Sequence, residues 1–385
     1  MFTFIKKVKT QGPVRITRVA GAMLAAGVVL FTGAAVFAGE NHEFNEQGNI
    51  VIADQFNNRV IEIDPESHKV VWHFGDGSDK PGPHSIVGTN DAERVGKFTL
   101  ISGTGIPNTT PPAPPLPGCS DNRVIVVNED GHIVWQYGQD NGVFGSGFNQ
   151  LNVPVAATFL PNRHILITDQ SNERVIEVNL KKTIVWQYGD PSGTGGVNPC
   201  ANPTALDDGR LNNPNSAELL KNGHILIADE NNNRAIEVDR YSHKIVHTFT
   251  ARCTVSGVAF ASRLDNGNTL ITDSNNSRIV EVDSDDEVVW QFLTNKRPGS
   301  IQMPLPTRAV RLRNGNTLIS DQFNNQVIEV NHEKDADIVF TQGKIAGLFP
   351  PGHGFNQLNG PYDAKVVSDF TGLTRPPKFD DDDEE

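Results

Sequence analysis

Short runs of alternating apolar and polar residues recur along this chain, separated by turns rich in Gly, Asn and Asp. The clearest copies are residues 266–292, NGNTLITDSNNSRIVEVDSDDEVVWQF, and 314–340, NGNTLISDQFNNQVIEVNHEKDADIVF. Runs such as TLIT and VIEV predict β-strands, because side chains alternate between the two faces of a strand. Six copies at a period of about 40 to 50 residues are typical of an array of four-stranded blades. The pattern therefore predicts an all-β, six-bladed β-propeller with four antiparallel strands per blade.

The blade boundaries follow from the recurring pattern. Blade 3 is expected at residues 153–189, blade 4 at 214–249, blade 5 at 254–292 and blade 6 at 304–343. Blade 2 begins at Asn90, is interrupted by the Pro-rich segment 104–118, and resumes at Asn122. That insertion cannot continue a sheet, so we expect it to project over the channel mouth or towards a partner.

Blade 1, at residues 48–75, has sequence for only three strands. Residues 354–367, GFNQLNGPYDAKVV, repeat the lead-in and inner strand of residues 147–160, GFNQLNVPVAATFL. We therefore predict that a C-terminal strand completes the N-terminal blade, which closes the ring and leaves no open blade-to-blade edge.

The two ends of the chain differ from the repeats. Residues 1–38 combine a basic start with an apolar run at 19–38, which predicts a signal peptide, with an uncleaved membrane anchor as the alternative. Either would place the propeller outside the cytoplasm, in the periplasm or the extracellular space. Residues 39–47 form a lead-in and residues 48–367 the propeller. The last segment, 368–385, ends in Asp and Glu only and is expected to be a disordered acidic tail.

Charge and cysteine content exclude several classes of function. Without the five basic residues that precede position 19, 28 basic residues face 46 acidic ones, a net charge of −18. Such a surface repels nucleic acid. The three cysteines show no CxxC or CxxCH spacing, so neither a zinc ribbon nor covalent haem is indicated. Cys200 and Cys253 flank blade 4 in connections on the same face, which predicts a disulfide between them and leaves Cys119 over.

Residues that recur in every copy are expected to belong to the scaffold. The four tryptophans occupy one slot of the outer strand, which predicts packing between blades. The Asp that ends the second strand is followed five residues later by Arg in four of five copies, a spacing that suits a brace across the loop. The asparagines of these loops suit tight turns, and their alternative role is a polar rosette that binds a glycan or a partner. The tryptophans are Trp72, Trp135, Trp186 and Trp290, and the aspartates are Asp54, Asp169, Asp229, Asp273 and Asp321.

The inner strands line the channel, and their polar residues differ between copies. Alignment on a shared Ala places Asp91, Ala156, Ser216, Arg308 and Asp363 at one level, and Asn90, Val155, Asn215, Thr307 and Tyr362 one residue earlier. These groups could orient a polar substrate, with one carboxylate as general base, or bind a cation. The alternative is a water-filled channel with a balanced ion pair.

Two histidines add to the candidates for a site. His84 and His353 lie in Gly-rich connections between blades, and are either catalytic imidazoles or exposed loop residues. The candidate catalytic residues are Asp91, Arg308, Tyr362, Asp363, His84 and His353. The candidate binding residues are Asn90, Asn215, Ser216 and Thr307.

The repeat resembles NHL repeats, whose blades share a Gly-x-Phe-x-x-Pro lead-in, a small-residue turn and an Asp-x-x-Asn-x-Arg loop. The matching residues are Gly147, Phe148 and Pro154 in the lead-in, with Asp54, Asn57 and Arg59 or Asp229, Asn232 and Arg234 in the loop. It is also similar to the repeats of arylsulfotransferase-like propellers in its GNTLI and VVW runs. That resemblance implies a nucleophilic His at the channel, and a zinc-dependent lyase also implies imidazole, but the aligned slots hold none. Similarity to six-bladed lactonases implies calcium, with oxygen ligands from Asp91, Asp363 and Asn215.

Two functions remain open from the sequence. The first is an exported, monomeric NHL-type propeller that binds a protein, a small molecule or a glycan at its Asn-rich face. The second is a channel-centred enzyme, similar to lactonases and other hydrolases, lyases or arylsulfotransferases, acting on a small polar substrate.

Overall fold

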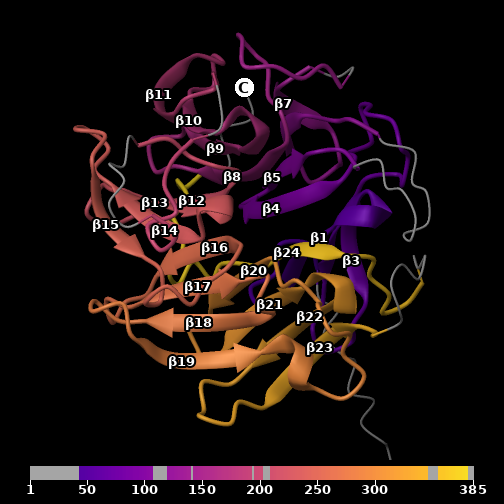
Figure 1. Ribbon diagram of the computed structural model, residues 1–385. Coiled ribbons are helices and arrows are strands. Elements are labelled where there is room, and N and C mark those ends of the chain that lie inside the picture. The colour runs from indigo at the N-terminus through magenta and orange to yellow at the C-terminus, as the bar shows by residue number, and fades with distance from the viewer. Residues whose placement is uncertain are drawn as a thin grey trace, which may run out of the picture. The chain divides into compact units, whose positions relative to one another are not determined.

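The strands of this protein form six four-stranded antiparallel sheets whose inner strands lie around a common axis (Figure 1). The computed structural model describes residues 43–106, 119–139, 142–192, 195–202, 209–345 and 354–379. The predicted all-β, six-bladed propeller is therefore confirmed. Residues 1–38 and the insertion residues 107–118 lie outside the described residues.

Each blade has the same order of strands from the channel outward. Blade 1 contains β24 (Pro361–Val366), β1 (Ile50–Asp54), β2 (Arg59–Ile63) and β3 (Val70–Phe74); blade 2 contains β4 (Thr89–Val95), β5 (Phe98–Gly103), β6 (Arg123–Val127) and β7 (Ile133–Tyr137). Blade 3 contains β8 (Pro154–Phe159), β9 (Ile165–Asp169), β10 (Arg174–Val178) and β11 (Ile184–Gly189); blade 4 contains β12 (Pro214–Leu219), β13 (Ile225–Asp229), β14 (Arg234–Val238) and β15 (Ile245–Phe249). Blade 5 contains β16 (Val258–Arg263), β17 (Thr269–Asp273), β18 (Arg278–Val282) and β19 (Val288–Leu293); blade 6 contains β20 (Arg308–Arg311), β21 (Thr317–Asp321), β22 (Gln326–Val330) and β23 (Ile338–Gly343).

The ring closes through the C-terminal strand, as predicted. Strand β24 pairs antiparallel with β1 from Ile50 opposite Val366 to Asp54 opposite Pro361. The first blade therefore takes its inner strand from the far end of the chain, and both ends of the propeller are held in one sheet.

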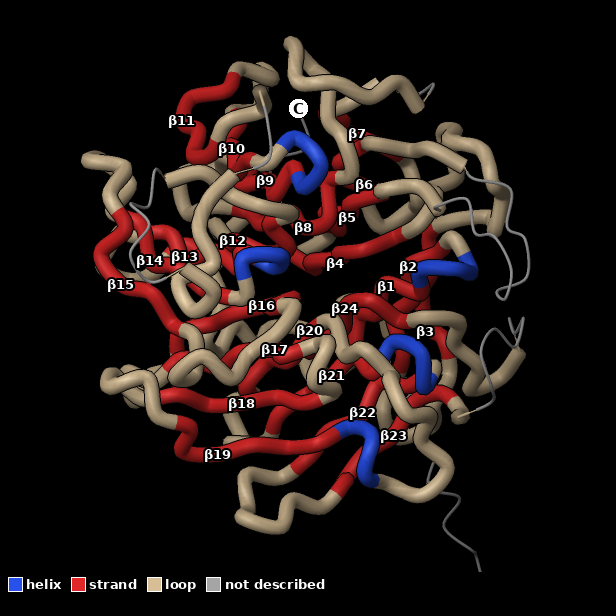
Figure 2. Tube along the Cα trace, viewed as in Figure 1, coloured by secondary structure: helices blue, strands red, loops and turns tan. Residues whose placement is uncertain are grey.

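Short 3₁₀ helices follow the second strand in four blades (Figure 2). They are η1 (Gln55–Asn57), η2 (Gln170–Asn172), η3 (Glu230–Asn232) and η5 (Gln322–Asn324), while η4 (Thr294–Lys296) lies in the connection between blades 5 and 6. In three of the four, the residue after the helix is an asparagine with left-handed backbone, as the Asn-rich pattern predicts. We call the face with these helices, where the inner strands begin, the upper face, and the opposite one the lower face.

The recurring Asp and Arg brace these loops. Arg Nε lies 2.6 to 2.8 Å from the Asp carboxylate in the pairs Arg59–Asp54, Arg174–Asp169, Arg234–Asp229 and Arg278–Asp273. Blade 6 has Gln326 in place of the Arg, and Arg297 from the preceding connection binds Asp321 instead. The brace is thus part of the scaffold in every blade where the sequence pattern predicts it.

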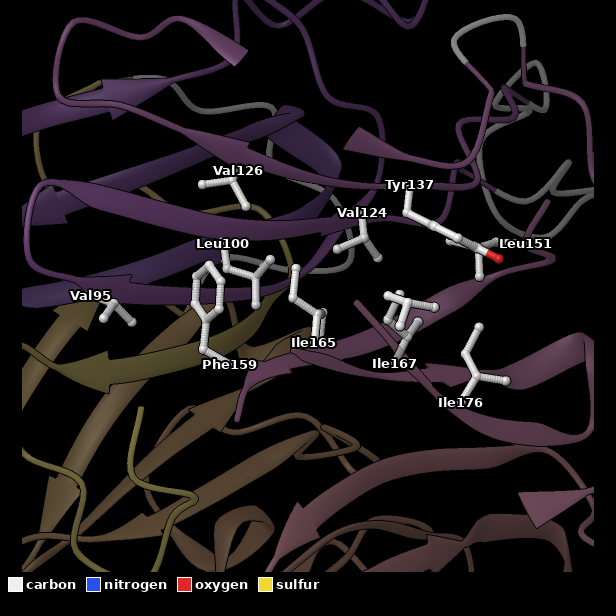
Figure 3. Packing of buried hydrophobic residues seen from close by; sticks show 12 residues of the cluster. Val95, Leu100, Val124, Val126, Tyr137, Leu151, Phe159, Ile165, Ile167 and Ile176 are labelled. Atoms are coloured by element: carbon white, nitrogen blue, oxygen red, sulfur yellow. The ribbon is translucent and has the colours of Figure 1, made fainter. Parts of the chain in front are cut away.

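Adjacent blades pack through hydrophobic side chains. Figure 3 shows this core between blades 2 and 3, where Leu100 and Tyr137 meet Phe159 and Ile167. Each tryptophan indole donates a hydrogen bond to a backbone carbonyl in the outer turn of the next blade: Trp72 to Glu129, Trp135 to Leu180, Trp186 to Arg240 and Trp290 to Glu333. The predicted role of the tryptophans in packing between blades is confirmed.

Two features outside the blades fix the connections and the C-terminal segment. Cys200 and Cys253 form a disulfide between the connections on either side of blade 4, as predicted. Residues 368–379, expected to belong to a disordered tail, pack against the lower face instead, because Thr374 and Phe379 find buried partners there. The acidic residues 380–385 lie outside the described residues. In the described part of the chain, no helix has the length and apolar character to cross a bilayer.

Candidate functional site

Two successive levels of the inner strands face the channel, because a β-bulge interrupts the pairing of the inner strand with its neighbour. In β12, Pro214 pairs with Asp229 and Ser216 with Ala228, so Asn215 is the extra residue. The same shift occurs at Asn90 in β4, Val155 in β8 and Tyr362 in β24. A bulge lets consecutive side chains face one side of a sheet. The register therefore supports the alignment of levels made from the sequence. In blade 5, Ala259 is the extra residue and Phe260 lies at the level of Asp91.

Four charged side chains meet at the middle of the channel. Arg308 Nη2 lies 3.1 Å from Asp91 Oδ1, and its Nε lies 2.6 Å from Asp363 Oδ1. Lys365 Nζ lies 2.5 Å from Asp91 Oδ1 and 2.8 Å from Asp363 Oδ2. Two carboxylates thus share two cations, and all four side chains are at most 8% exposed. We call these residues the channel ion cluster.

The cations of the cluster act unequally on its two carboxylates. Burial alone would raise the pKa of Asp91, but Lys365 and Arg308 outweigh it and hold that pKa below the ordinary range. Burial raises the pKa of Asp363 to about 6, against the lowering effect of Arg308 and Lys365. Backbone donors also bind these carboxylates, since the Ala157 amide lies 2.8 Å from Asp91 Oδ2 and the Ala92 amide 3.2 Å from Asp363 Oδ2. The cluster is closely balanced in charge, and each carboxylate is paired with both cations.

Two further carboxyl groups lie below the cluster. Glu93 accepts a 2.9 Å hydrogen bond from the Phe159 amide, and Glu218 accepts hydrogen bonds from the amide and hydroxyl of Thr374. Burial raises the pKa of Glu93 to about 8 and also raises the pKa of Glu218. A cavity of about 10 Å³, enough for one water molecule, adjoins Glu93 and Lys365. At neutral pH this level of the channel therefore favours the protonated form of Glu93.

Glu93 should make stability depend on pH. Its unfolded-state pKa is near 4.5 and its folded-state pKa about 8, so the folded chain holds a proton that the unfolded chain releases. The resulting stabilisation is complete below pH 4.5 and is lost as pH rises towards 8, at up to about 1.4 kcal/mol per pH unit. We expect Glu93→Gln to flatten the fall in the free energy of unfolding between pH 6 and 8, measured by urea denaturation. An unchanged slope would contradict this assignment.

Polar side chains form a hydrogen-bonded ring at the upper end of the channel. Gln322 Nε2 donates to Gln55 Oε1 at 2.7 Å, and Gln55 Nε2 donates to Asn90 Oδ1 at 2.9 Å. Across the channel, Glu230 Oε2 accepts from Asn215 Nδ2 at 2.7 Å and from Gln170 Nε2 at 3.4 Å. We call Gln55, Asn90, Gln170, Asn215, Glu230, Gln322 and Tyr362 the upper-mouth ring.

The hydroxyl of Tyr362 joins the two halves of this ring. It donates to Asn215 Oδ1 at 3.1 Å, and it also interacts with the side chain of Asn90. Burial and the nearby Glu230 raise the pKa of Tyr362, so the phenol stays protonated. Burial also raises the pKa of Glu230 against the hydrogen bonds from Asn215 and Asn213. The ring is therefore rich in amide donors and acceptors and carries little charge.

An aromatic pair stands beside the ring. Phe56 and Phe323 directly follow Gln55 and Gln322, and their rings stack with centroids 6.3 Å apart. Both side chains are partly exposed, as are Gln170 and Glu230. The upper mouth thus combines accessible polar groups with an apolar ring surface.

The structure brings together most residues predicted for the site. Asp91, Arg308 and Asp363 meet in the ion cluster, and Asn90, Asn215 and Tyr362 belong to the ring above it. Thr307 is close by and donates to the Tyr362 carbonyl at 2.6 Å, while Ser216 is buried at the level of Asp91. The predicted binding and catalytic candidates of the inner strands therefore form one continuous polar channel.

The histidines and the calcium set do not fit this channel. His84 is exposed, and its ring faces that of His132 in the outer turn of blade 2, 6.5 Å between centroids, while His353 lies outside the described residues. Calcium would need Asp91 and Asp363 as ligands, but the Lys365 ammonium lies between these carboxylates where the metal would bind. The Lys365 ammonium group therefore occupies the place that calcium would need.

Sequence reasoning missed Lys365, Glu93, Glu218 and the members of the upper-mouth ring that come from the 3₁₀ helices. The sequence did contain a signal for the upper-mouth ring, because the residue directly after the recurring Asp differs between blades. It is Gln55, Gln170, Glu230, Ser274 or Gln322. Variation at one place in a constant loop is the pattern that already singled out the inner strands.

Comparisons with known proteins support the fold alone. No model of a known protein family matches the sequence, and no curated protein matches it significantly. A protein of unknown function from Bacteroides caccae is similar in structure, with a TM-score of 0.50 and 14% identity over 77% of this chain and 93% of that chain. Virginiamycin B lyase from Staphylococcus aureus is similar with a TM-score of 0.43 and 13% identity over 72% of this chain and 76% of that chain. At these identities the likeness shows a propeller and nothing of its chemistry.

Proposed function

We propose that this protein is an exported binding propeller that holds a neutral carbohydrate at its upper-mouth ring. The observation that carries the proposal is the ring itself, a set of amide, carboxyl and phenol groups with little charge beside the stacked pair Phe56 and Phe323. Amide groups supply both donors and acceptors to hydroxyl groups, and aromatic faces cover the apolar side of a sugar ring. An anionic ligand would find no cation free to receive it in this ring.

Export is part of the same proposal. The N-terminal segment 1–38 has the pattern of a signal peptide, and the disulfide between Cys200 and Cys253 is suited to an oxidising compartment. The NHL-type repeat is in keeping with a binding platform, since propellers of this type bind ligands on one face of the ring.

A channel-centred enzyme is supported less well. Asp363, with a pKa of about 6, is the strongest candidate for a general base, but both Arg308 and Lys365 bind its carboxylate. A base that is held by two cations and fully buried has little access to a substrate proton. The ion cluster therefore suits a structural role better than turnover.

The carbohydrate proposal predicts a specific loss of affinity. We expect at least one of a panel of neutral oligosaccharides, cellopentaose, maltopentaose, xylopentaose and mannopentaose, to bind in isothermal titration calorimetry. Gln170→Ala with Glu230→Gln should weaken that binding at least tenfold, because two hydrogen-bonding groups worth about 1 kcal/mol each are changed. Asn231→Ala is the control, since Asn231 is exposed on the same 3₁₀ helix and lies outside the ring. Equal affinities of the two variants, or no binding to any of the sugars, would sink the proposal.

A further inference from the structure

The C-terminal segment, residues 368–379, runs along the lower face and lies against all the blades that follow blade 1. It leaves blade 1 after β24, and the Arg313 amide of blade 6 donates to Asp369 Oδ2 at 2.8 Å. In blade 5, a Cβ built on Gly372 would lie 3.4 Å from the Arg263 carbonyl oxygen. Thr374 then meets blade 4, and Phe379 meets blades 2 and 3. The segment therefore crosses beneath the channel, on the opposite side from the upper-mouth ring.

The first anchor of this segment is Thr374. Its amide and hydroxyl donate to Glu218 Oε2 at 2.7 and 2.5 Å, and the Leu219 amide donates to its hydroxyl oxygen at 2.8 Å. Thr374 is 1% exposed and Glu218 3%. The Glu218 side chain and the Leu219 amide of β12 thus bind both the backbone and the side chain of Thr374. No strand pairing holds Thr374 in place.

The second anchor is Phe379, five residues further along the chain. Its ring packs edge-to-face against Phe98 and Phe159, with centroids 5.4 Å apart in both cases, and the Arg163 guanidinium lies 5.7 Å from its centre. Phe379 thereby extends the hydrophobic core between blades 2 and 3. An aromatic side chain in an apolar pocket at a fixed distance from a hydrogen-bonded residue is a recurring arrangement in peptide recognition.

The described part of this segment forms no β-strand, so it depends on its anchors rather than on the sheet. By contrast, β24 directly before it pairs with β1 along its whole length. The segment can therefore leave the lower face without opening the ring. Its departure would uncover the level of Glu93 and Lys365, which Asp369 and Phe370 line from below.

We propose that the lower mouth of the channel is a binding site for an extended peptide with a Thr and a Phe five residues apart, which the chain fills with its own C-terminal segment. Glu218 and the Leu219 amide recognise the Thr, and Phe98 with Phe159 recognises the Phe. In the filled state the segment covers the channel from below. This site is separate from the proposed carbohydrate site and does not depend on it.

The test uses the full-length mature protein with a cleavage site for a specific protease inserted between Thr371 and Gly372. After folding and cleavage, a fluorescent peptide of residues 372–385 is added, and its binding is followed by fluorescence anisotropy. We expect the labelled peptide to replace the cleaved fragment. Peptides with Thr374→Val or Phe379→Ala should bind at least tenfold more weakly, whereas Lys378→Ala, at an exposed position, should bind as the unaltered peptide does.

Each other outcome would overturn the proposal. If the cleaved fragment never exchanges, the segment is a permanent part of the fold and the site is not open to peptides. If cleavage unfolds the propeller, the segment is needed for the ring to close. If the Thr374→Val and Phe379→Ala peptides bind as well as the unaltered one, the anchors do not recognise the segment. Glu218→Gln in the cleaved protein adds a second check, because loss of the carboxylate should weaken peptide binding while Lys221→Gln, at an exposed neighbouring position, should not.

Discussion

Replacement of Lys365 by Met is expected to lower the free energy of unfolding by about 3 to 5 kcal/mol, the usual cost of breaking a buried ion pair. Lys365 Nζ lies within 2.8 Å of both Asp91 and Asp363, and neither carboxylate has access to water. Without the ammonium, Arg308 alone faces two buried carboxylates, and Asp363 should become protonated at neutral pH. Urea denaturation of the purified variant at pH 7 measures the effect.

Two further variants distinguish the contribution of the ion cluster to the free energy of unfolding from a general effect of removing a lysine. Lys221→Met removes an ion pair with Asp265 whose lysine side chain is 91% exposed, and it should cost less than about 0.5 kcal/mol. Asp363→Asn together with Lys365→Met should recover part of the loss, because the uncompensated carboxylate is removed as well. Equal stabilities of the Lys365 and Lys221 variants would show that the cluster contributes little.

Loss of the disulfide should be the second large effect. Cys200 and Cys253 are separated by 53 residues, and closing a loop of that length stabilises a fold by about 4 kcal/mol through the unfolded state. We expect the variant with both cysteines replaced by Ser to lose about that much free energy of unfolding, measured under oxidising conditions against the unaltered protein. Cys119→Ser is the control and should change stability much less. A double variant as stable as the control would show that the bond does not constrain the unfolded chain.

The fold was predictable from the sequence because its signals repeat. Six copies of one strand pattern define the blades, and the echo of residues 147–160 in residues 354–367 identifies the closing strand β24. The same repetition assigned Trp72 and its equivalents to the packing between blades. A feature that occurs in most blades can be checked against its own copies, so local sequence was sufficient.

The site was predictable only in part, because its contacts join residues that no repeat relates. Alignment on the shared Ala identified the level of Asp91, Arg308 and Asp363. It did not reveal that the side chain of Lys365, two residues beyond Asp363 in β24, reaches back to the carboxylates of Asp91 and Asp363. The long side chain of lysine spans more than one level of the channel.

The C-terminal segment was misjudged for the same reason. An acidic end favours a solvated tail, and the sequence does not reveal that Thr374 and Phe379 have partners on distant blades. Contacts that occur once, between residues far apart in the chain, leave no periodic signal in a single sequence.

Hydrogen exchange of backbone amides, measured by mass spectrometry with and without the tightest-binding oligosaccharide of the panel, tests the central claim most directly. If the ligand lies at the upper-mouth ring, protection should increase at η1, η2, η3 and η5, whose first residues Gln55, Gln170, Glu230 and Gln322 belong to that ring. Peptides from the outer strands should exchange as before. Protection confined to the lower face or to the outer strands, with none at these four helices, would contradict a binding site at the upper mouth.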